Sequence, residues 1–232
     1  MAYSFSPLGD QAIIIELGNA INEDTHNQIK AITSVLEANP PHWMTEFIPA
    51  FTTITIFYNP LLLLYNEAET DLAALLEKAS EMKPPLSRTV EIPVCYGGSY
   101  GPDLEFVAQH NGLSAEEVIR IHLEETYTVH MIGFAPGFPY LGGMSEKIAA
   151  PRRETPRMQI PARSVGIAGN QTGVYPISTP GGWQLIGRTP LPLFTPNKKN
   201  PGLLRTGDKI IFRQISEDVF QTMEADINAD DT

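Results

Sequence analysis

The sequence has one cysteine, few basic residues and no apolar segment of membrane-spanning length, and each shortage excludes a class of protein. Cys95 alone cannot form an internal disulfide, which fits a protein of a reducing compartment. The run of leucines at residues 61–64 is far shorter than the roughly 20 residues that cross a bilayer. The 16 Lys and Arg against 27 Asp and Glu leave a net charge of −11, which argues against nucleic acid or an anionic membrane as a partner. We therefore expect a soluble, cytoplasmic protein.

The first 95 residues alternate strand-like and helix-like segments. Residues 52–58 (TTITIFY) combine β-branched and aromatic residues, as strands do, and Asn39-Pro40-Pro41 stops a preceding amphipathic helix because proline cannot continue its hydrogen bonds. The predicted order is strand, helix, strand, strand, helix, strand, over residues 11–17, 22–38, 45–48, 52–58, 67–82 and 90–94. This order predicts a ferredoxin-like α+β domain over residues 1–95.

The remainder is rich in glycine and proline. Ten of the 18 glycines lie between Gly133 and Gly187, and they separate short β-prone pieces such as SVGIAG and WQLIG. Many short strands with tight turns predict a barrel or sandwich. We place this domain at residues 96–215, with two short helices within residues 102–122 ahead of most of its strands. Residues 216–232 are acidic, and we expect them to form a frayed, solvated tail.

The segment GGWQLIGRTP, residues 181–190, is close to a phosphate-binding loop, with Arg188 in place of the lysine. Such a loop needs a helix that begins at the lysine, but Trp183 to Ile186 has the pattern of a strand. The prolines at positions 190 and 192 also exclude a helical turn with free N–H donors. We therefore expect no nucleotide-binding loop in this chain.

A small anion remains a plausible ligand, because residues 155–207 contain no acidic side chain. In an otherwise acidic chain these 53 residues hold six cations, namely Arg157, Arg163, Arg188, Lys198, Lys199 and Arg205. Arginine suits a bidentate contact with a carboxylate or phosphate. The polar residues Gln171, Tyr175 and Gln184 fall in the same stretch. The alternative is that these cations are ordinary surface charges.

His130 is the remaining candidate for chemistry. It alternates with Val129 and Met131 ahead of a glycine-rich turn, where it would act as a general acid or base or remain a structural histidine. Cys95 follows a strand and is expected to be an inert buried thiol. No set of residues has the spacing of a metal site.

The segments HMIGFAPGFPYLGGM (residues 130–144) and APRRETPRMQIPARSVGIAGNQTGVYPISTPGGWQLIGRTP (residues 150–190) closely resemble the KipI/PxpB family, also called allophanate hydrolase subunit 1. The opening SPLGDQAIIIEL and the middle segment EIPVCYGGSYGPDLEFVA resemble it too, so the match extends to about residue 213. The resemblance implies a ferredoxin-like N-terminal domain followed by an all-β cyclophilin-like barrel.

The resemblance also implies work in a complex. Similar proteins are subunits of a bacterial ATP-dependent 5-oxoprolinase, with a PxpC-type partner (allophanate hydrolase subunit 2) and a PxpA-type partner (LamB/YcsF). ATP would be used by the complex and bound outside this chain. Other members, the KipI proteins, inhibit a sporulation sensor histidine kinase, so an enzyme subunit and an inhibitory binding module both remain open. A homo-oligomer is a further alternative.

Each alternative predicts its own residues. For the enzyme, we expect Arg188 or Arg157 to hold an anion, His130 to transfer a proton, and Gln171, Tyr175 and Gln184 to orient the substrate. For kinase inhibition, an apolar groove would grip the partner with Phe134, Phe138, Tyr140 and Trp183. One departure stands out, since the resemblance leads us to expect glycine where this chain has Arg163. Glycine would permit a positive φ or close approach of a ligand there.

Overall fold

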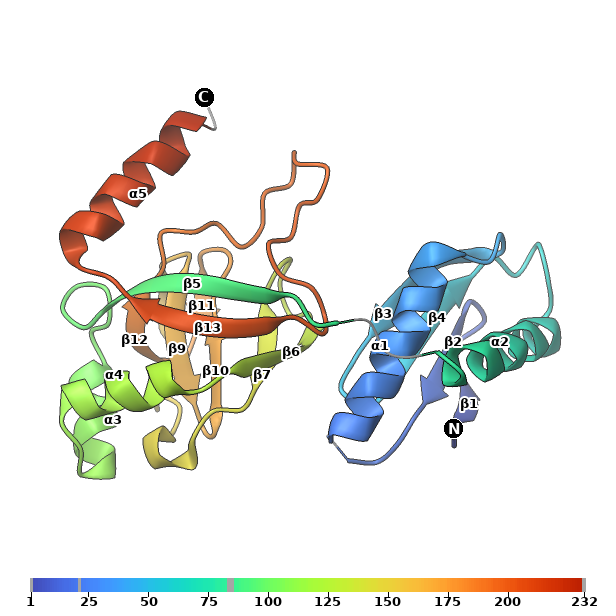
Figure 1. Cartoon of the computed structure of the whole chain (residues 1–232), viewed down its shortest axis with the longest axis horizontal. Helices are drawn as coiled ribbons and strands as arrows, with labels where there is room; N and C mark the ends of the chain where they lie inside the picture. Colours follow the sequence, from blue (N-terminus) through green and yellow to red (C-terminus); the bar gives the residue numbers. More distant parts are fainter. Residues whose placement is uncertain (1, 21, 83–85, 231–232) are drawn as a thin grey trace. The chain divides into compact units, whose positions relative to one another are not determined.

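The structure, a computed structural model, describes residues 2–20, 22–82 and 86–230, and the chain divides into two units, Met1–Ser87 and Arg88–Thr232. In the first unit a four-stranded antiparallel sheet has the order β1-β2-β4-β3, and two helices pack together against it (Figure 1). Its elements are β1 (Ser4–Pro7), β2 (Ala12–Glu16), α1 (Glu23–Ala38), β3 (Met44–Pro49), β4 (Thr53–Tyr58) and α2 (Tyr65–Ser80).

The predicted helices and central strands of this unit are confirmed within about two residues. In β4 every second side chain is buried, which is the alternation expected of a strand with one face on a core. Helix α1 begins after Asn22, whose side chain accepts a hydrogen bond of 2.8 Å from the N–H of Thr25. The isoleucines of β2 and β4 meet one apolar stripe from each helix, so this unit has a core of its own.

The predicted fourth strand does not belong to this sheet. Residues 90–94 lie in β5 (Thr89–Tyr96), which pairs with strands of the second unit, while the fourth position of the first sheet is taken by β1. The prediction is wrong because an alternating pattern identifies the buried face of a strand but not its partner. Strand β1 escaped prediction because it is short, ends in Pro7 and is not fully buried at any position.

The second unit is built on a seven-stranded mixed sheet of order β10-β9-β12-β5-β13-β6-β7, in which β5 and β13 run parallel. Strands β8 and β11 form a separate pair. Its strands are β5, β6 (Tyr127–Ile132), β7 (Pro139–Gly142), β8 (Arg157–Ile160), β9 (Ser164–Ala168), β10 (Gln171–Val174), β11 (Thr179–Gly181), β12 (Gln184–Arg188) and β13 (Lys209–Gln214). Its helices are α3 (Leu104–Asn111), α4 (Ala115–Glu124), the short η1 (Glu146–Ile148) and α5 (Glu217–Asp230).

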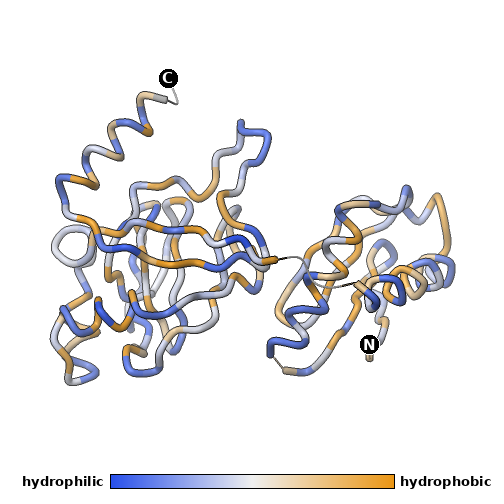
Figure 2. The backbone as a smooth tube through the Cα atoms, in the orientation of Figure 1, coloured by the Kyte–Doolittle hydropathy of each residue, from blue (hydrophilic) through white to orange (hydrophobic). Residues whose placement is uncertain are grey.

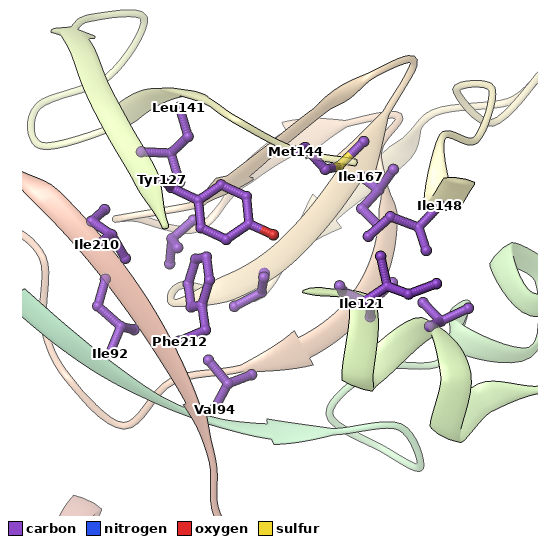
Figure 3. Packing of buried hydrophobic residues seen from close by; sticks show 14 of the residues in the cluster. Ile92, Val94, Ile121, Tyr127, Leu141, Met144, Ile148, Ile167, Ile210 and Phe212 are labelled. Carbon is purple, nitrogen blue, oxygen red and sulfur yellow. The ribbon is translucent and has the colours of Figure 1, made fainter. Parts of the chain in front are cut away.

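The two edge strands of this sheet, β7 and β10, come together and nearly close a barrel. A Cβ placed on Gly173 of β10 would lie 3.2 Å from the ring of Phe138 and 3.5 Å from the carbonyl oxygen of Pro139 in β7. The absence of a side chain at Gly173 therefore suits the close approach of the two edges, because a Cβ would press on the ring of Phe138. Tyr127 and Phe212 fill the centre of the barrel with aliphatic residues around them (Figure 3).

Two helix predictions in this unit have different outcomes. The two short helices are confirmed as α3 and α4, and the latter starts with the capping box of Ser114 and Glu117. The tail predicted to be frayed instead forms helix α5, because the ring of Phe220 is buried against the barrel. In the described part of the chain, no helix combines the length and apolar character needed to span a membrane.

Candidate functional site

A cavity of about 280 Å³ lies beside the place where the edge strands β7 and β10 approach each other. It is lined by Phe134, Phe138, Tyr140, Arg152, Gln171, Tyr175, Pro180, Gly181, Gly182 and Trp183. Six of the ten residues predicted for a site, from both the substrate set and the groove set, are in this lining. The sequence had assigned them to different functions, but the fold brings them into one cavity.

The apolar wall of the cavity is organised around Phe138. Its ring centroid lies 5.3 Å from that of Tyr140, 5.5 Å from that of Tyr175 and 5.8 Å from that of Trp183, each in edge-to-face geometry. Rings in this geometry hold one another in place, and the side chains of Phe138, Tyr175 and Trp183 are buried. The wall is therefore apolar and closely packed.

The exposed ring of Phe134 stands at the edge of the cavity. Its centroid lies 5.5 Å from that of Phe138, its side chain is 68% exposed, and its backbone has the rare φ of +67°. A non-glycine residue in this conformation is strained, and such strain concentrates at functional sites. A solvent-exposed aromatic ring held in this way is available for contact with a ligand or another protein.

Tyr175 and Gln171 contribute the uncharged polar groups of the cavity. Burial raises the pKa of Tyr175 to about 12, against a smaller opposing effect of Arg152 and Arg157. The phenol therefore remains a hydrogen-bond donor near neutral pH. Gly181 makes room for it, since a Cβ there would lie 2.8 Å from the Tyr175 oxygen.

Arg152 is the one charged side chain among the described residues that line this cavity. Sequence reasoning missed it, because the acid-free stretch was counted from Glu154 onward. The doublet Arg152-Arg153 gave only a weak signal, since nothing in the sequence links it to Gln171 or Tyr175. An exposed arginine at the edge of an apolar cavity can bind a carboxylate in a bidentate manner.

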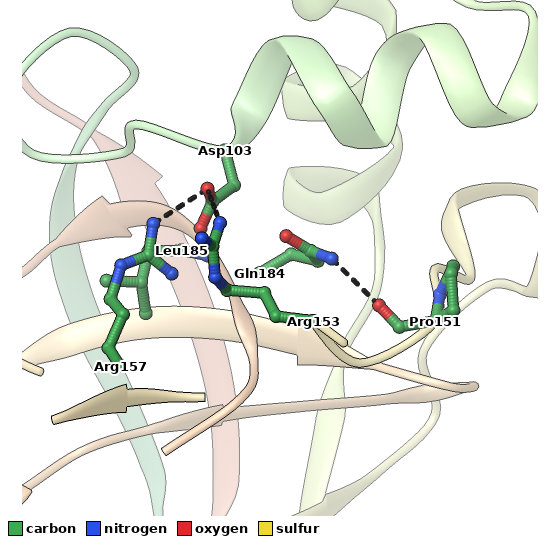
Figure 4. A network of polar contacts seen from close by, with 6 residues as sticks. All are labelled: Asp103, Pro151, Arg153, Arg157, Gln184 and Leu185. Carbon is green, nitrogen blue, oxygen red and sulfur yellow. Dashed lines mark hydrogen bonds and ion pairs between the residues drawn. The ribbon is translucent and has the colours of Figure 1, made fainter. Parts of the chain in front are cut away.

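Arg157 forms an ion pair with the buried carboxylate of Asp103 (Figure 4). Its Nη2 donates to Asp103 at 2.8 Å, and Arg153 donates to the same oxygen at 3.2 Å. The other Asp103 oxygen accepts from the N–H of Leu185 at 2.7 Å. Residues 155–207 contain no acidic side chain, so the carboxylate that pairs with Arg157 comes from Asp103, directly before α3. Arg157 therefore supports the wall of the cavity rather than lining it.

The remaining predicted residues lie outside the cavity lining. Gln184 is buried, and its amide donates to the carbonyl of Pro151 at 2.9 Å. Arg188, at the other end of β12, donates from Nε to the carbonyl of Ala162 at 2.9 Å. The ring of His130 packs over Gly142, where a Cβ would lie 2.2 Å from its Nε2. Burial and the charge of Lys209 lower the pKa of His130.

The middle of the GGWQLIGRTP segment, Gln184–Arg188, forms strand β12, and Gly181 ends β11. Gln184 and Leu185 pair with β9, and Gly187 and Arg188 pair with both β9 and β5. Their backbone groups are therefore engaged in the sheet and do not surround a phosphate. The described residues also contain no group of three His, Cys, Asp or Glu side chains placed to hold a metal ion.

A histidine that the sequence did not single out as functional is completely buried in the barrel. His122 has Nδ1 2.8 Å from the Tyr96 hydroxyl and Nε2 3.0 Å from the Thr172 hydroxyl, and burial lowers its pKa to about 3. The Thr172 hydroxyl also donates to the carbonyl of Gly166 at 3.1 Å. This polar chain joins α4 to the strands behind the cavity.

The cavity can bind and orient, but its lining supplies no proton acceptor near neutral pH. Among the described lining residues there is no Ser, Cys, His, Asp or Glu, and the Tyr175 hydroxyl is held protonated. Within the lining, Arg152 can bind a carboxylate, and the Tyr175 hydroxyl and the Gln171 amide can donate to a carbonyl. Any general base must come from outside this lining.

Comparison with known proteins agrees with the resemblance seen in the sequence. The model of the carboxyltransferase domain, subdomains C and D, matches residues 3–204. The B-type subunit of the 5-oxoprolinase from Bacillus subtilis (strain 168) is 49% identical, over 97% of this chain and 98% of that protein. The corresponding 5-oxoprolinase subunit of Escherichia coli O157:H7 is 44% identical, over 88% of this chain and 93% of that protein.

A solved structure shares the fold. The crystal structure of TTHA0988 superposes with a TM-score of 0.77 at 34% identity, and the match covers 89% of this chain and 40% of that longer chain.

Proposed function

The chain belongs to the carboxyltransferase subdomain C and D family, within the KipI/PxpB group, and from this membership we propose that it is the PxpB-type subunit of an ATP-dependent 5-oxoprolinase. The observation that carries the proposal is the match to 5-oxoprolinase subunits over nearly the whole chain, at 49% identity over 97% of it. The reaction would open the cyclic amide 5-oxoproline to glutamate in a cytoplasmic complex. The two units would be the ferredoxin-like and cyclophilin-like domains of the family.

The cavity supports a substrate of this kind. 5-Oxoproline is a small flat lactam that bears one carboxylate. Arg152 would hold the carboxylate, and the Tyr175 hydroxyl with the Gln171 amide would contact the lactam carbonyl. The rings of Phe138 and Trp183 would cover the faces of the ring. Most ligand pockets are apolar with a few placed polar groups, and this one has that composition at the small end of their size range.

Catalysis would be completed by other subunits. ATP would drive the opening of this strain-free lactam: its γ-phosphoryl group would be transferred to the lactam oxygen with release of ADP. Water would then add to the activated carbon, phosphate would leave, and the C–N bond would break to give glutamate. This chain would orient that oxygen through Tyr175, while PxpA-type and PxpC-type partners would bind ATP and add the base. His130 and Arg188 keep their predicted roles in proton transfer and anion binding only as proposals, to be tested by substitution.

Kinase inhibition is a second candidate, favoured by one observation. The exposed, strained Phe134 at the edge of an aromatic cavity would suit an apolar protein segment. In that case Phe134, Phe138, Tyr140 and Trp183 would grip a sensor histidine kinase.

The first experiment is ATP-dependent glutamate release from 5-oxoproline by this chain with its PxpA-type and PxpC-type partners, omitting each in turn. We expect activity only when all are present. Undiminished activity without this chain would contradict the proposal, and binding to the kinase would then be measured.

Within the active complex, Arg152→Ala is expected to raise KM for 5-oxoproline at least about tenfold, because it removes a charged hydrogen bond to the carboxylate. Arg120→Ala is the matched control, since its side chain is exposed on α4 and lies outside the cavity lining. A large KM effect of Arg188→Ala with none of Arg152→Ala would reverse the assignment and restore the prediction made from sequence.

A further inference from the structure

Helix α5 follows β13 at the end of the chain (Figure 1), and only one narrow stripe of its side chains is buried or half-buried. Phe220 is 1% exposed, Met223, Glu224 and Ile227 are half-buried, and the other described side chains of the helix are exposed. These four positions follow the i, i+3, i+4, i+7 spacing of one helix face. Hydrophobic positions recur among hydrophilic ones along this helix (Figure 2).

Two arginines lie under this stripe. Arg163 forms an ion pair with Glu224, and its Nη1 donates to the carbonyl of Pro190 at 2.8 Å. The guanidinium of Arg188 lies over the ring of Phe220, 5.9 Å from its centroid. Burial and the charge of Arg163 lower the pKa of Arg188, while Glu224 opposes the shift. The carboxylate of Glu224 therefore offsets repulsion between two partly buried cations.

The backbone of Arg163 indicates that this arrangement is specific. Its φ is +71°, a conformation that favours glycine and disfavours side chains with a Cβ. The guanidinium contacts with Pro190 and Glu224 offset that strain. Tyr100 completes the surface, with its ring centroid 4.5 Å from that of Phe220.

We propose that Tyr100, Arg163 and Arg188 form a docking site for an acidic amphipathic helix, which α5 occupies within this chain and for which a helix of a partner protein competes. The occupant is defined by α5 itself: an aromatic residue, a glutamate four positions later and an aliphatic residue seven positions later. Charge complementarity selects it, because two cations require a carboxylate and the surface beside them accepts an aromatic ring. This inference does not rest on the proposed enzymatic function.

Exchange is favoured by the way α5 is attached. Phe220 is the one fully buried side chain among the described residues of the helix, and Tyr100 and Arg188 lie against its ring. Glu224 adds an ion pair with Arg163. The strands beneath are held by the sheet and the barrel core. Elements with few buried contacts open most readily. The partner helix then gains the same contacts that α5 gives up.

The test is binding of a fluorescent peptide with the sequence of residues 216–229 to the full-length chain, followed by anisotropy. We expect Phe220→Ala/Glu224→Gln to bind it at least about tenfold more tightly than the unaltered chain, in which α5 competes at high effective concentration. Glu224→Gln alone keeps the test valid if the double variant does not fold, and it should bind more tightly as well. Adding Arg163→Gly to either variant should weaken binding about tenfold, since it removes the charged contact.

Two matched controls isolate the site. Glu124→Gln removes an exposed ion pair of α4 with Arg120 and should leave peptide binding as in the unaltered chain. A peptide with Gln in place of its Glu224 should bind about tenfold more weakly than the parent. Equal peptide affinity for all variants, or affinity unaffected by Arg163→Gly, would overturn the proposal.

Discussion

The imidazole of His122 stays neutral in the folded chain, because complete burial lowers its pKa from 6.5 to about 3. In the unfolded chain the same group takes up a proton once the pH falls below about 6.5. Between these values the unfolded state binds more protons, so folding stability decreases as the pH falls. Above pH 6.5 the group adds no pH dependence.

We expect His122→Gln to flatten the loss of stability between pH 6.5 and pH 4 by up to about 1.4 kcal/mol per pH unit, since it removes one titrating group. Denaturant unfolding at several pH values measures the difference between the variant and the unaltered chain. His110→Gln is the control, because His110 is exposed on α3. Parallel pH profiles of the unaltered chain and His122→Gln would show that His122 is not buried as a neutral group.

At the scale of elements, the carboxylate of Asp103 joins several separate segments around the cavity. It precedes α3, accepts from β12 through the N–H of Leu185, and binds Arg157 of β8 as well as Arg153. The N–H of Arg153 in turn donates to the carbonyl of Gly182 at 2.7 Å. One buried carboxylate thus positions the segments on both sides of the Gly181–Gly182 wall.

Asp103→Asn is expected to destabilise the second unit by about 2–3 kcal/mol, because an amide cannot accept from both arginines and from Leu185. Chemical denaturation measures the change. Glu91→Gln offers a comparison, since its pair with Arg213 is more than half exposed on both sides and should contribute less than about 1 kcal/mol. If both substitutions lower the free energy of unfolding by the same amount, the three contacts of Asp103 contribute no more to stability than a surface ion pair does.

The elements themselves were largely predictable from local sequence. Helix α4 follows from its capping box, and α1 follows from its apolar stripe and the prolines after it, because those signals act within a few residues. Helix α5 was missed since its acidic composition outweighed the single ring of Phe220. Strand β5 was recognised as a strand but assigned to the wrong sheet, because its partner β13 lies more than a hundred residues away.

At the scale of the whole molecule, the chain has a separate hydrophobic core in each unit. Leu76 belongs to the core of the first unit and Phe212 to that of the second, and both side chains are fully buried. Units with their own cores can unfold in separate steps.

We expect Leu76→Ala to destabilise the first unit by about 2–5 kcal/mol and to speed hydrogen exchange there, with protection in the second unit retained. Phe212→Ala should do the reverse. Hydrogen exchange followed by mass spectrometry resolves the two units. Equal acceleration in both units by either substitution would mean that the two cores unfold as one.

By itself, the sequence determined the classes of element, the absence of a phosphate loop in GGWQLIGRTP and membership of the family, since these depend on local patterns and on long specific motifs. It also pointed to Gln171, Tyr175 and the aromatic residues that the cavity gathers. Only the tertiary structure decided which arginine faces that cavity. Arg157 is bound by Asp103, more than fifty residues earlier, and Arg188 lies against α5, while Arg152 reaches the lining. The physical reason is that an arginine's availability depends on the nearest carboxylate in space, and sequence spacing does not reveal that neighbour.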